Sequence, residues 1–110
     1  MNDFDTEILR PNFSPICRAI AGRELIEFEY NGSMRLAIPC AHGTLTSGNE
    51  ALRAHQVYIR GHSRSVGIGK LYLVSKILNP RPTGEVFASN PHGYQLNDTA
   101  MQDIHCQLTS

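Results

Sequence analysis

The stretch ELIEFEYNGSMRLAIP, residues 24–39, constrains the fold more than any other part of the chain. Apolar side chains from Ile26 to Tyr30 alternate with glutamates, which is the two-residue period of a strand with one apolar face. The pair Asn31-Gly32 suits a two-residue hairpin turn, and a second alternating run follows it. The segment therefore predicts a β-hairpin. We expect its return strand to end at Pro39, because proline has no amide hydrogen for a central ladder.

The rest of the chain divides into one helix and three further strands. The segment SPICRAIAGR predicts a short helix, because Ser14 can cap it, Pro15 suits its first turn and Gly22 can end it in the left-handed conformation. Apolar alternation predicts strands over residues 50–59, 70–77 and 104–108, and turn-forming residues predict loops over 41–49, 60–69 and 79–97. We therefore expect a mainly β fold, a small five-stranded antiparallel SH3-like or Sm-like barrel with one short N-terminal helix.

The length of 110 residues fits a single domain. Residues 1–13 show no period and are expected to be a flexible N-terminal arm, and residues 14–110 are expected to form the barrel domain. No apolar run approaches the length of a membrane span, so no membrane partner is expected. The acidic start of the chain lacks the apolar core of a secretory signal, and a cytoplasmic location is expected.

Cysteine and histidine spacing predicts neither a disulfide framework nor a metal site. Cys17, Cys40 and Cys106 are odd in number and far apart, so we expect three small, mostly buried thiols. Cys40 and His42 lack the spacing of a zinc pair, and so do His105 and Cys106. Adjacent residues of a strand also point to opposite faces, which argues against shared chelation by the second pair. No cofactor is expected.

Positive charge is concentrated in one third of a formally neutral chain. Residues 51–84 contain six basic side chains and no Asp or Glu, whereas both ends of the chain are acidic. Such asymmetry favours an anionic partner. The alternative stays open that the acidic ends fold back over the basic segment and neutralise it.

Strand alternation turns this charge into a candidate binding face. If Leu52 and Ala54 point inward, Arg53 and His55 point outward together, with Arg53 at the centre of the face. The other candidate ligand-binding residues are Arg35, Arg60, Arg64, Lys70 and Lys76, of which Arg60 and Arg64 lie on or beside the glycine-rich loop over 60–69. Arginine suits forked contact with phosphate, so the expected ligand is a nucleotide or single-stranded nucleic acid.

No motif indicates an enzyme. The sequence GHSRS lacks the closing glycine of a nucleophile elbow, and a strand rather than a helix is expected after it. The segment GHSRSVGIGK has the wrong spacing for a nucleotide-hydrolysis loop. We therefore expect no catalytic residues.

The order of the segments AI-x2-R-x-LIEFEY, RLAIP, LRAHQV and KLYLVSKI resembles a WYL domain, the small Sm-like or SH3-like barrel of bacterial transcription regulators and phage-defence proteins. The likeness covers residues 16–108, although ALRAHQV replaces the Trp-Tyr-Leu tripeptide and Leu73 replaces an arginine. It implies a basic pocket to which Arg35, Lys70 and Lys76 contribute by position. The chain looks like the free-standing, single-domain variants, since it has no room for a winged helix.

Two functions follow as expectations. The first is a regulatory module that binds a ligand or nucleic acid on its basic face. The second is a non-catalytic structural module that pairs with itself or with a protein partner, for example as an accessory protein of a regulatory or phage-defence system.

Overall fold

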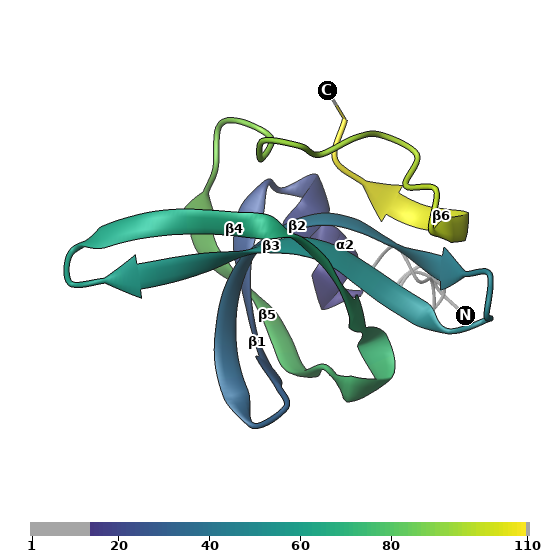
Figure 1. Ribbon diagram of the computed structural model, residues 1–110, viewed down its shortest axis with the longest axis horizontal. Helices are drawn as coiled ribbons and strands as arrows, with labels where there is room; N and C mark the ends of the chain where they lie inside the picture. The colour runs from purple at the N-terminus through teal and green to yellow at the C-terminus, as the bar shows by residue number, and fades with distance from the viewer. Residues whose placement is uncertain (1–13, 110) are drawn as a thin grey trace, which may run out of the picture.

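The computed structural model describes residues 14–109 and has a mainly β fold with one short α-helix (Figure 1). The predicted arm over residues 1–13 lies outside the described part. In chain order the elements are α2 (Pro15–Ala21), β1 (Glu24–Tyr30), β2 (Ser33–Leu45), β3 (Glu50–Arg60), β4 (Ser63–Leu73), the 3-10 turn η2 (Val74–Lys76), β5 (Leu78–Val86) and β6 (Met101–Gln107). Among residues 14–109, no helix is long and apolar enough to cross a membrane.

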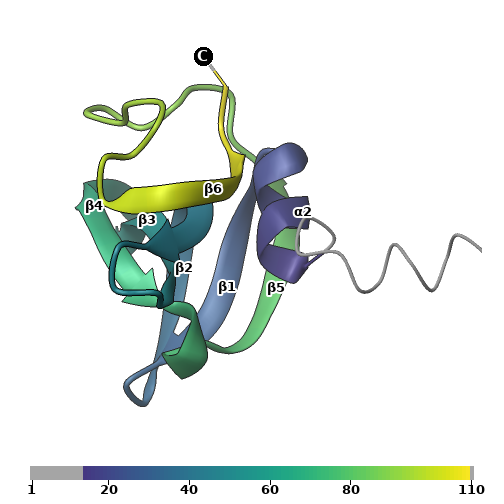
Figure 2. The same cartoon turned by 90° about the vertical axis from the view of Figure 1, so that its right-hand side faces the viewer.

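The strands form one antiparallel, six-stranded sheet. Five of them follow the order β4-β3-β2-β1-β5, and β6 pairs with the second half of β2. The end strands β4 and β5 do not pair with each other, so the sheet is not closed and the predicted barrel is not confirmed. The helix α2 lies beside β1 and β5, close to the end of β6 (Figure 2).

The predicted hairpin is confirmed, but its return strand is longer than expected. Asn31 and Gly32 both have positive φ, at 51° and 78°, as a two-residue hairpin turn requires. The end of the strand at Pro39 was wrong, because β2 continues to Leu45. The ladder with β3 shifts register just after Pro39, so the missing amide falls where the pairing is irregular.

The helix α2 is the one predicted, with a different ending. The Ser14 hydroxyl oxygen accepts a hydrogen bond from the Cys17 amide at 3.2 Å, as expected for a cap. Gly22, at φ −84°, is not left-handed; the left-handed residue is Arg23, at φ 53°. The inner side of the helix buries Ile16, Cys17, Ala19 and Ile20.

The predicted loop over residues 60–69 was wrong. A two-residue turn at 61–62 joins β3 directly to β4, which starts at Ser63. The outer half of this hairpin, residues 57–66, projects from the body, and we call it the hairpin arm (Figure 1). The predicted irregular segment is shorter than expected, because β5 extends to Val86. The part without regular structure, residues 87–100, is called the strap.

The core contains the large apolar side chains of Ile26, Phe28 and Leu52, together with the apolar side of α2. The expectation of three free thiols was wrong, because Cys17 of α2 and Cys106 of β6 form a disulfide with a Cα–Cα distance of 5.8 Å. These cysteines are 89 residues apart in sequence, and they meet because β6 returns to pair with β2 beside α2.

Candidate ligand-binding site

The strap is fixed to the start of β1 by Arg23. The Arg23 guanidinium donates to the carbonyl oxygens of Phe87 and Ala88, at 3.4 and 3.3 Å, and to the Asn90 amide oxygen at 2.8 Å. Its central carbon also lies 4.9 Å from the centre of the Phe87 ring, within range of a cation–π contact. The strap then arches from β5 over to β6 (Figure 2).

The strap is also tied to the end of the chain. The Tyr94 hydroxyl donates to the Leu108 carbonyl oxygen at 2.8 Å, and burial raises the pKa of Tyr94 to about 12. The Asn97 amide donates to the Gln107 side-chain oxygen at 2.9 Å. A segment without helix or strand is therefore anchored at several points along its length.

The third anchor joins the strap to β3 through Arg53 and Asp98. Arg53 Nε and Nη2 donate to the two Asp98 carboxylate oxygens at 2.6 and 3.2 Å, and Asp98 Oδ1 also accepts from the Ala100 amide at 3.0 Å. The Arg53 hydrogen bond lowers the pKa of Asp98 below its ordinary value, against the opposing effect of burial. The Arg53 side chain is 26% exposed and that of Asp98 is 10% exposed. The prediction of Arg53 as the exposed centre of a basic face was wrong.

His55 lies beside Arg53 on the same face of β3, as alternation predicted, but it is only 4% exposed. Its Nδ1 is 2.9 Å from the Gly67 carbonyl oxygen, which can only accept, so Nδ1 carries the hydrogen. A Cβ at Gly69 would lie 2.8 Å from His55 Nε2, so the ring position requires glycine there. His55 Nε2 forms no hydrogen bond within residues 14–109. The outward exposure expected for His55 was wrong, because its ring lies against the backbone of β4 at Gly67 and Gly69.

A pocket of about 480 Å³ lies between this face and the strap. Its sheet side is formed by Arg53, His55, Ile68 and Gly69, and its other side by residues 92–99. The volume is in the range of small-molecule sites. The pocket combines the free N–H groups of Arg53, an imidazole nitrogen and the polar side chains of the strap.

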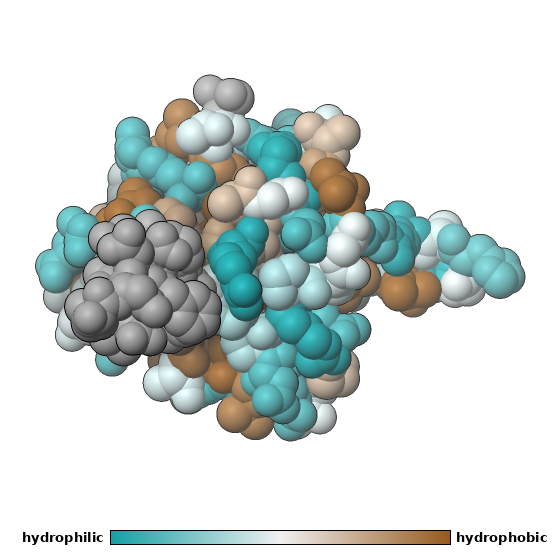
Figure 3. All heavy atoms as spheres, turned by 180° about the vertical axis from the view of Figure 1, so that it is seen from behind, coloured by the Kyte–Doolittle hydropathy of each residue, from teal (hydrophilic) through white to brown (hydrophobic). Residues whose placement is uncertain are grey.

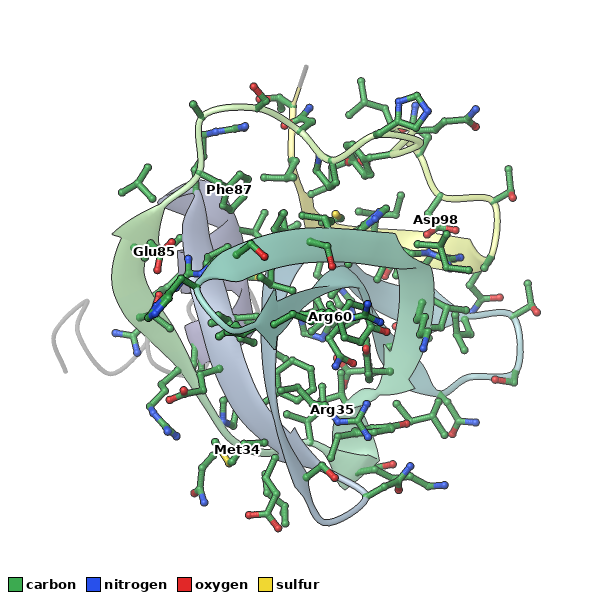
Figure 4. All side chains as sticks on the ribbon, turned by 60° about the vertical axis from the view of Figure 1, so that its left-hand side comes forward. Met34, Arg35, Arg60, Glu85, Phe87 and Asp98 are labelled. Atoms are coloured by element: carbon green, nitrogen blue, oxygen red, sulfur yellow. A yellow bond between two sulfur atoms is a disulfide. The ribbon has the colours of Figure 1, made fainter. Side chains whose placement is uncertain are left out.

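Arg35 lies on the other face of the sheet. It donates to the Gln56 side-chain oxygen and to the Tyr30 carbonyl oxygen, both at 3.2 Å. Its Nε is buried and has no hydrogen-bond partner within residues 14–109. Figure 4 shows Arg35 below the hairpin arm and Asp98 above it. Arg35 and Arg53 therefore cannot contact one small ligand together.

The remaining predicted residues are dispersed. Arg60 lies near the tip of the hairpin arm, and Arg64 in the arm forms an ion pair with Glu85 (Figure 4). Lys70 pairs with Ala54, so it lies on the sheet face opposite to the one that lines the pocket. Lys76 lies in η2. The single basic face was therefore wrong. The alternative that the acidic ends fold back over the basic segment is met in part, because Asp98 pairs with Arg53 and Glu85 pairs with Arg64, while the acidic start of the chain lies outside the described residues.

The strap residues of the pocket were not predicted as site residues. One signal was present in the sequence, because Asp98 is the lone acidic residue between Glu85 and Asp103. From the sequence alone, however, the isolated Asp98 could not be assigned to Arg53 as its partner.

No protein-family model matches the chain, and neither does any curated protein or any solved structure. The resemblance to WYL domains therefore stays a prediction from the order of the sequence motifs.

Proposed function

We propose that this protein is a non-catalytic binding module that holds a small anionic ligand of nucleotide size in the pocket under the strap. One observation carries the proposal: Arg53 and His55 stand side by side at the base of a pocket of about 480 Å³. The contact with Asp98 uses only part of the Arg53 donor set, and the remaining N–H groups suit a phosphate or carboxylate.

The strap supplies the second half of the recognition. Gln95 and Asn97 line the pocket and offer both donors and acceptors, which suit the polar edge of a nucleobase. Asp98 repels an anion, so the ligand has to compete with this carboxylate for Arg53. This competition favours a ligand that adds contacts beyond its charged group.

A nucleic-acid strand is less well supported than a small ligand. A strand needs a basic groove along several nucleotides, whereas the basic residues here lie on both sides of the sheet. The regulatory role and the SH3-like barrel of the WYL resemblance belong to the proposal; the antiparallel strands and the short N-terminal helix support only the mainly β part of it.

Calorimetric titration with adenosine 5′-monophosphate, inorganic phosphate and a short oligothymidine tests this function. We expect the mononucleotide to bind best, with an affinity that falls as salt is raised, as for other phosphate contacts. His55→Gln and Asn97→Ala should each weaken binding, and Arg53→Ala should weaken it about tenfold or more, the equivalent of about 1.4 kcal/mol. Arg64→Ala is the matched control and should leave binding unchanged. Circular dichroism checks that each variant is folded.

Two outcomes contradict the proposal. One is the absence of mononucleotide binding at low salt. The other is oligothymidine binding that Arg60→Ala or Lys70→Ala abolishes and Arg53→Ala leaves intact.

A second function, self-association or binding of a protein partner, is favoured by the hairpin arm. β4 is an end strand of the sheet, and Ile59 and Val66 on the arm are 61% and 52% exposed. Figure 3 shows the arm projecting from the body with both hydrophobic and hydrophilic side chains. Exposed apolar edge strands are common sites of association. Light scattering after gel filtration tests this: a dimer that Val66→Lys converts to a monomer supports it, and a monomer at all concentrations contradicts self-association.

A further inference from the structure

Three segments far apart in sequence bring two sulfur atoms and one imidazole together. Cys17 comes from α2, His42 from β2 and Cys106 from β6, and their ligand-type atoms all lie within 4.8 Å of one another. Cys17 and His42 are only 1% and 3% exposed, and Cys106 is half-buried. Cys106 stands directly opposite His42 because β6 has an irregularity at His105, which has no partner in the ladder.

The hydrogen bonding of His42 leaves one ring nitrogen aimed at the sulfur atoms. His42 Nε2 lies 3.0 Å from a Glu50 carboxylate oxygen, which can only accept, so Nε2 carries the hydrogen. In the neutral ring Nδ1 then presents a lone pair, and it lies 3.5 Å from Cys17 Sγ. A sulfur of a disulfide has no hydrogen to donate. The disulfide form therefore leaves a buried acceptor without a donor, which is costly.

One distance in this cluster, between Cys17 Sγ and His42 Nδ1, is that of two ligands around a tetrahedral metal ion. Bond lengths of about 2.3 Å to sulfur and 2.0–2.1 Å to nitrogen place the two kinds of ligand about 3.5 Å apart in a tetrahedron. Cys17 Sγ and His42 Nδ1 already have this separation. The two sulfur atoms need to move apart to about 3.8 Å, and breaking the bond between them allows this.

We propose that the reduced chain binds one Zn²⁺, or a similar thiophilic divalent cation, through Cys17 Sγ, His42 Nδ1 and Cys106 Sγ, and that the disulfide is the metal-free state. An external dithiol supplies two electrons and two protons, cleaves the bond between the sulfur atoms and is itself oxidised to a disulfide. The two protein thiols then release their protons to solvent as the cation binds. These residues supply three ligands, and a water molecule would be the fourth.

Glu50 orients the His42 ring in the proposed site through a hydrogen bond to Nε2. Histidine ligands commonly donate their other ring N–H to a carboxylate, which fixes the tautomer and the ring orientation. Glu50 makes this contact with His42. The sequence predicted no metal site, because only the neighbouring pairs Cys40–His42 and His105–Cys106 were considered. The proposed site instead takes one residue from each of three segments.

Cobalt titration of the full chain tests the proposal. The protein is reduced, freed of reductant without oxygen, and titrated with Co²⁺ alone. We expect one equivalent to bind, with thiolate-to-cobalt charge-transfer bands and the visible bands of tetrahedral coordination, and Zn²⁺ should displace it. The untreated disulfide form should give no such bands.

Variants separate the three ligands from other residues. Cys106→Ser and His42→Gln should abolish the thiolate bands. Cys40→Ser is the matched control and should retain them, because Cys40 is a buried free cysteine outside the cluster. Glu50→Gln should keep the bands and weaken the affinity by about 10- to 100-fold.

Circular dichroism decides how the titration is interpreted. If the reduced chain stays folded and gives no thiolate–cobalt band, the proposal is wrong. If reduction unfolds the chain, Co²⁺ or Zn²⁺ must restore the native spectrum, and failure to do so also overturns it. Equal loss of the bands in Cys40→Ser and Cys106→Ser contradicts the assigned ligands.

Discussion

The strap, residues 87–100, and the hairpin arm, residues 57–66, differ in what holds them in place. The strap has no regular structure, yet Arg23, Arg53 and the end of the chain anchor it through side chains. The arm has a regular backbone ladder, yet it projects from the body, and beyond the buried Val57 its apolar side chains Tyr58, Ile59 and Val66 are exposed. Regular secondary structure and firm attachment to the core are therefore separate properties in this molecule. The candidate pocket lies against the well-anchored segment.

The ion pairs of the two regions show the same difference. Arg53 of β3 and Asp98 of the strap form a forked pair that is largely shielded from water. Arg64 of the arm and Glu85 are both nearly half-exposed. Exposed pairs add little to stability, whereas removal of one partner from a shielded pair leaves a charge without compensation.

The largest expected effect is the loss of the disulfide that holds β6, where the strap ends. Cys106→Ser, or reduction in the presence of a chelator, should lower the free energy of unfolding by about 4 kcal/mol, because the bond closes a long loop. The two cysteines are 89 residues apart. Urea unfolding measures this change. A loss below about 1 kcal/mol would mean that the strap and β6 are held without the bond.

The next effect compares two arginines. Arg53→Ala should cost about 2 kcal/mol, because it removes a charged hydrogen-bond donor from the buried Asp98 carboxylate. Arg64→Ala should change stability by less than about 0.5 kcal/mol. An Arg53 exposed at the centre of a basic face, as the sequence predicted, would give a nearly neutral effect, and the contact with Asp98 reverses that expectation. Chemical denaturation of both variants checks it, and equal effects would contradict the distinction between strap and arm.

Substitution of two glycines of β4 compares the packing beside the pocket with the packing beside the hairpin arm. An added Cβ would lie 2.8 Å from the His55 ring at Gly69 and 2.8 Å from the Tyr58 ring at Gly67. Gly69→Ala should cost about 1–2 kcal/mol, because the buried imidazole has little room to move. Gly67→Ala should cost less, because the Tyr58 side chain is partly exposed and can turn outward. Thermal unfolding ranks the two variants, and the reverse order would contradict the buried position of His55.

The smallest effect concerns pH. The pKa of Asp98 is lowered in the folded chain, chiefly by the Arg53 hydrogen bond, below its ordinary value of 3.8. The stabilisation is therefore complete above about pH 5 and is lost as the pH falls through 3.8 and then through the folded pKa. The stability difference between the wild type and Asp98→Asn should be full at pH 6 and should shrink at pH 3. A difference that is constant between these pH values would show that Asp98 is not ionised in the pair.

The sequence predicted the elements that local periodicity encodes. Alternation located the first hairpin and β3, and it placed Arg53 and His55 on one face. The glycines of residues 60–69 were interpreted as part of a loop, whereas Gly67 and Gly69 make space for aromatic rings on a strand. Their role depends on side chains of the neighbouring strand β3, and the local sequence pattern around the glycines gives no information on that strand.

The closing contacts of the fold were beyond prediction for a related reason. The strap has no period, so nothing in its sequence indicates that it covers β3. The disulfide joins segments that become neighbours only after β6 pairs with β2. Asp98 was visible as an isolated acid, but its partner Arg53 could be assigned only in three dimensions.

The most direct test of the pocket as the ligand site is a titration of ¹⁵N-labelled protein with adenosine 5′-monophosphate, followed by amide chemical shifts. The account predicts that the largest shift changes occur at Arg53, at His55, at Gly69 and along residues 92–99, while amides of the hairpin arm stay unchanged. Changes confined to the hairpin arm, or no saturable change anywhere, would contradict it.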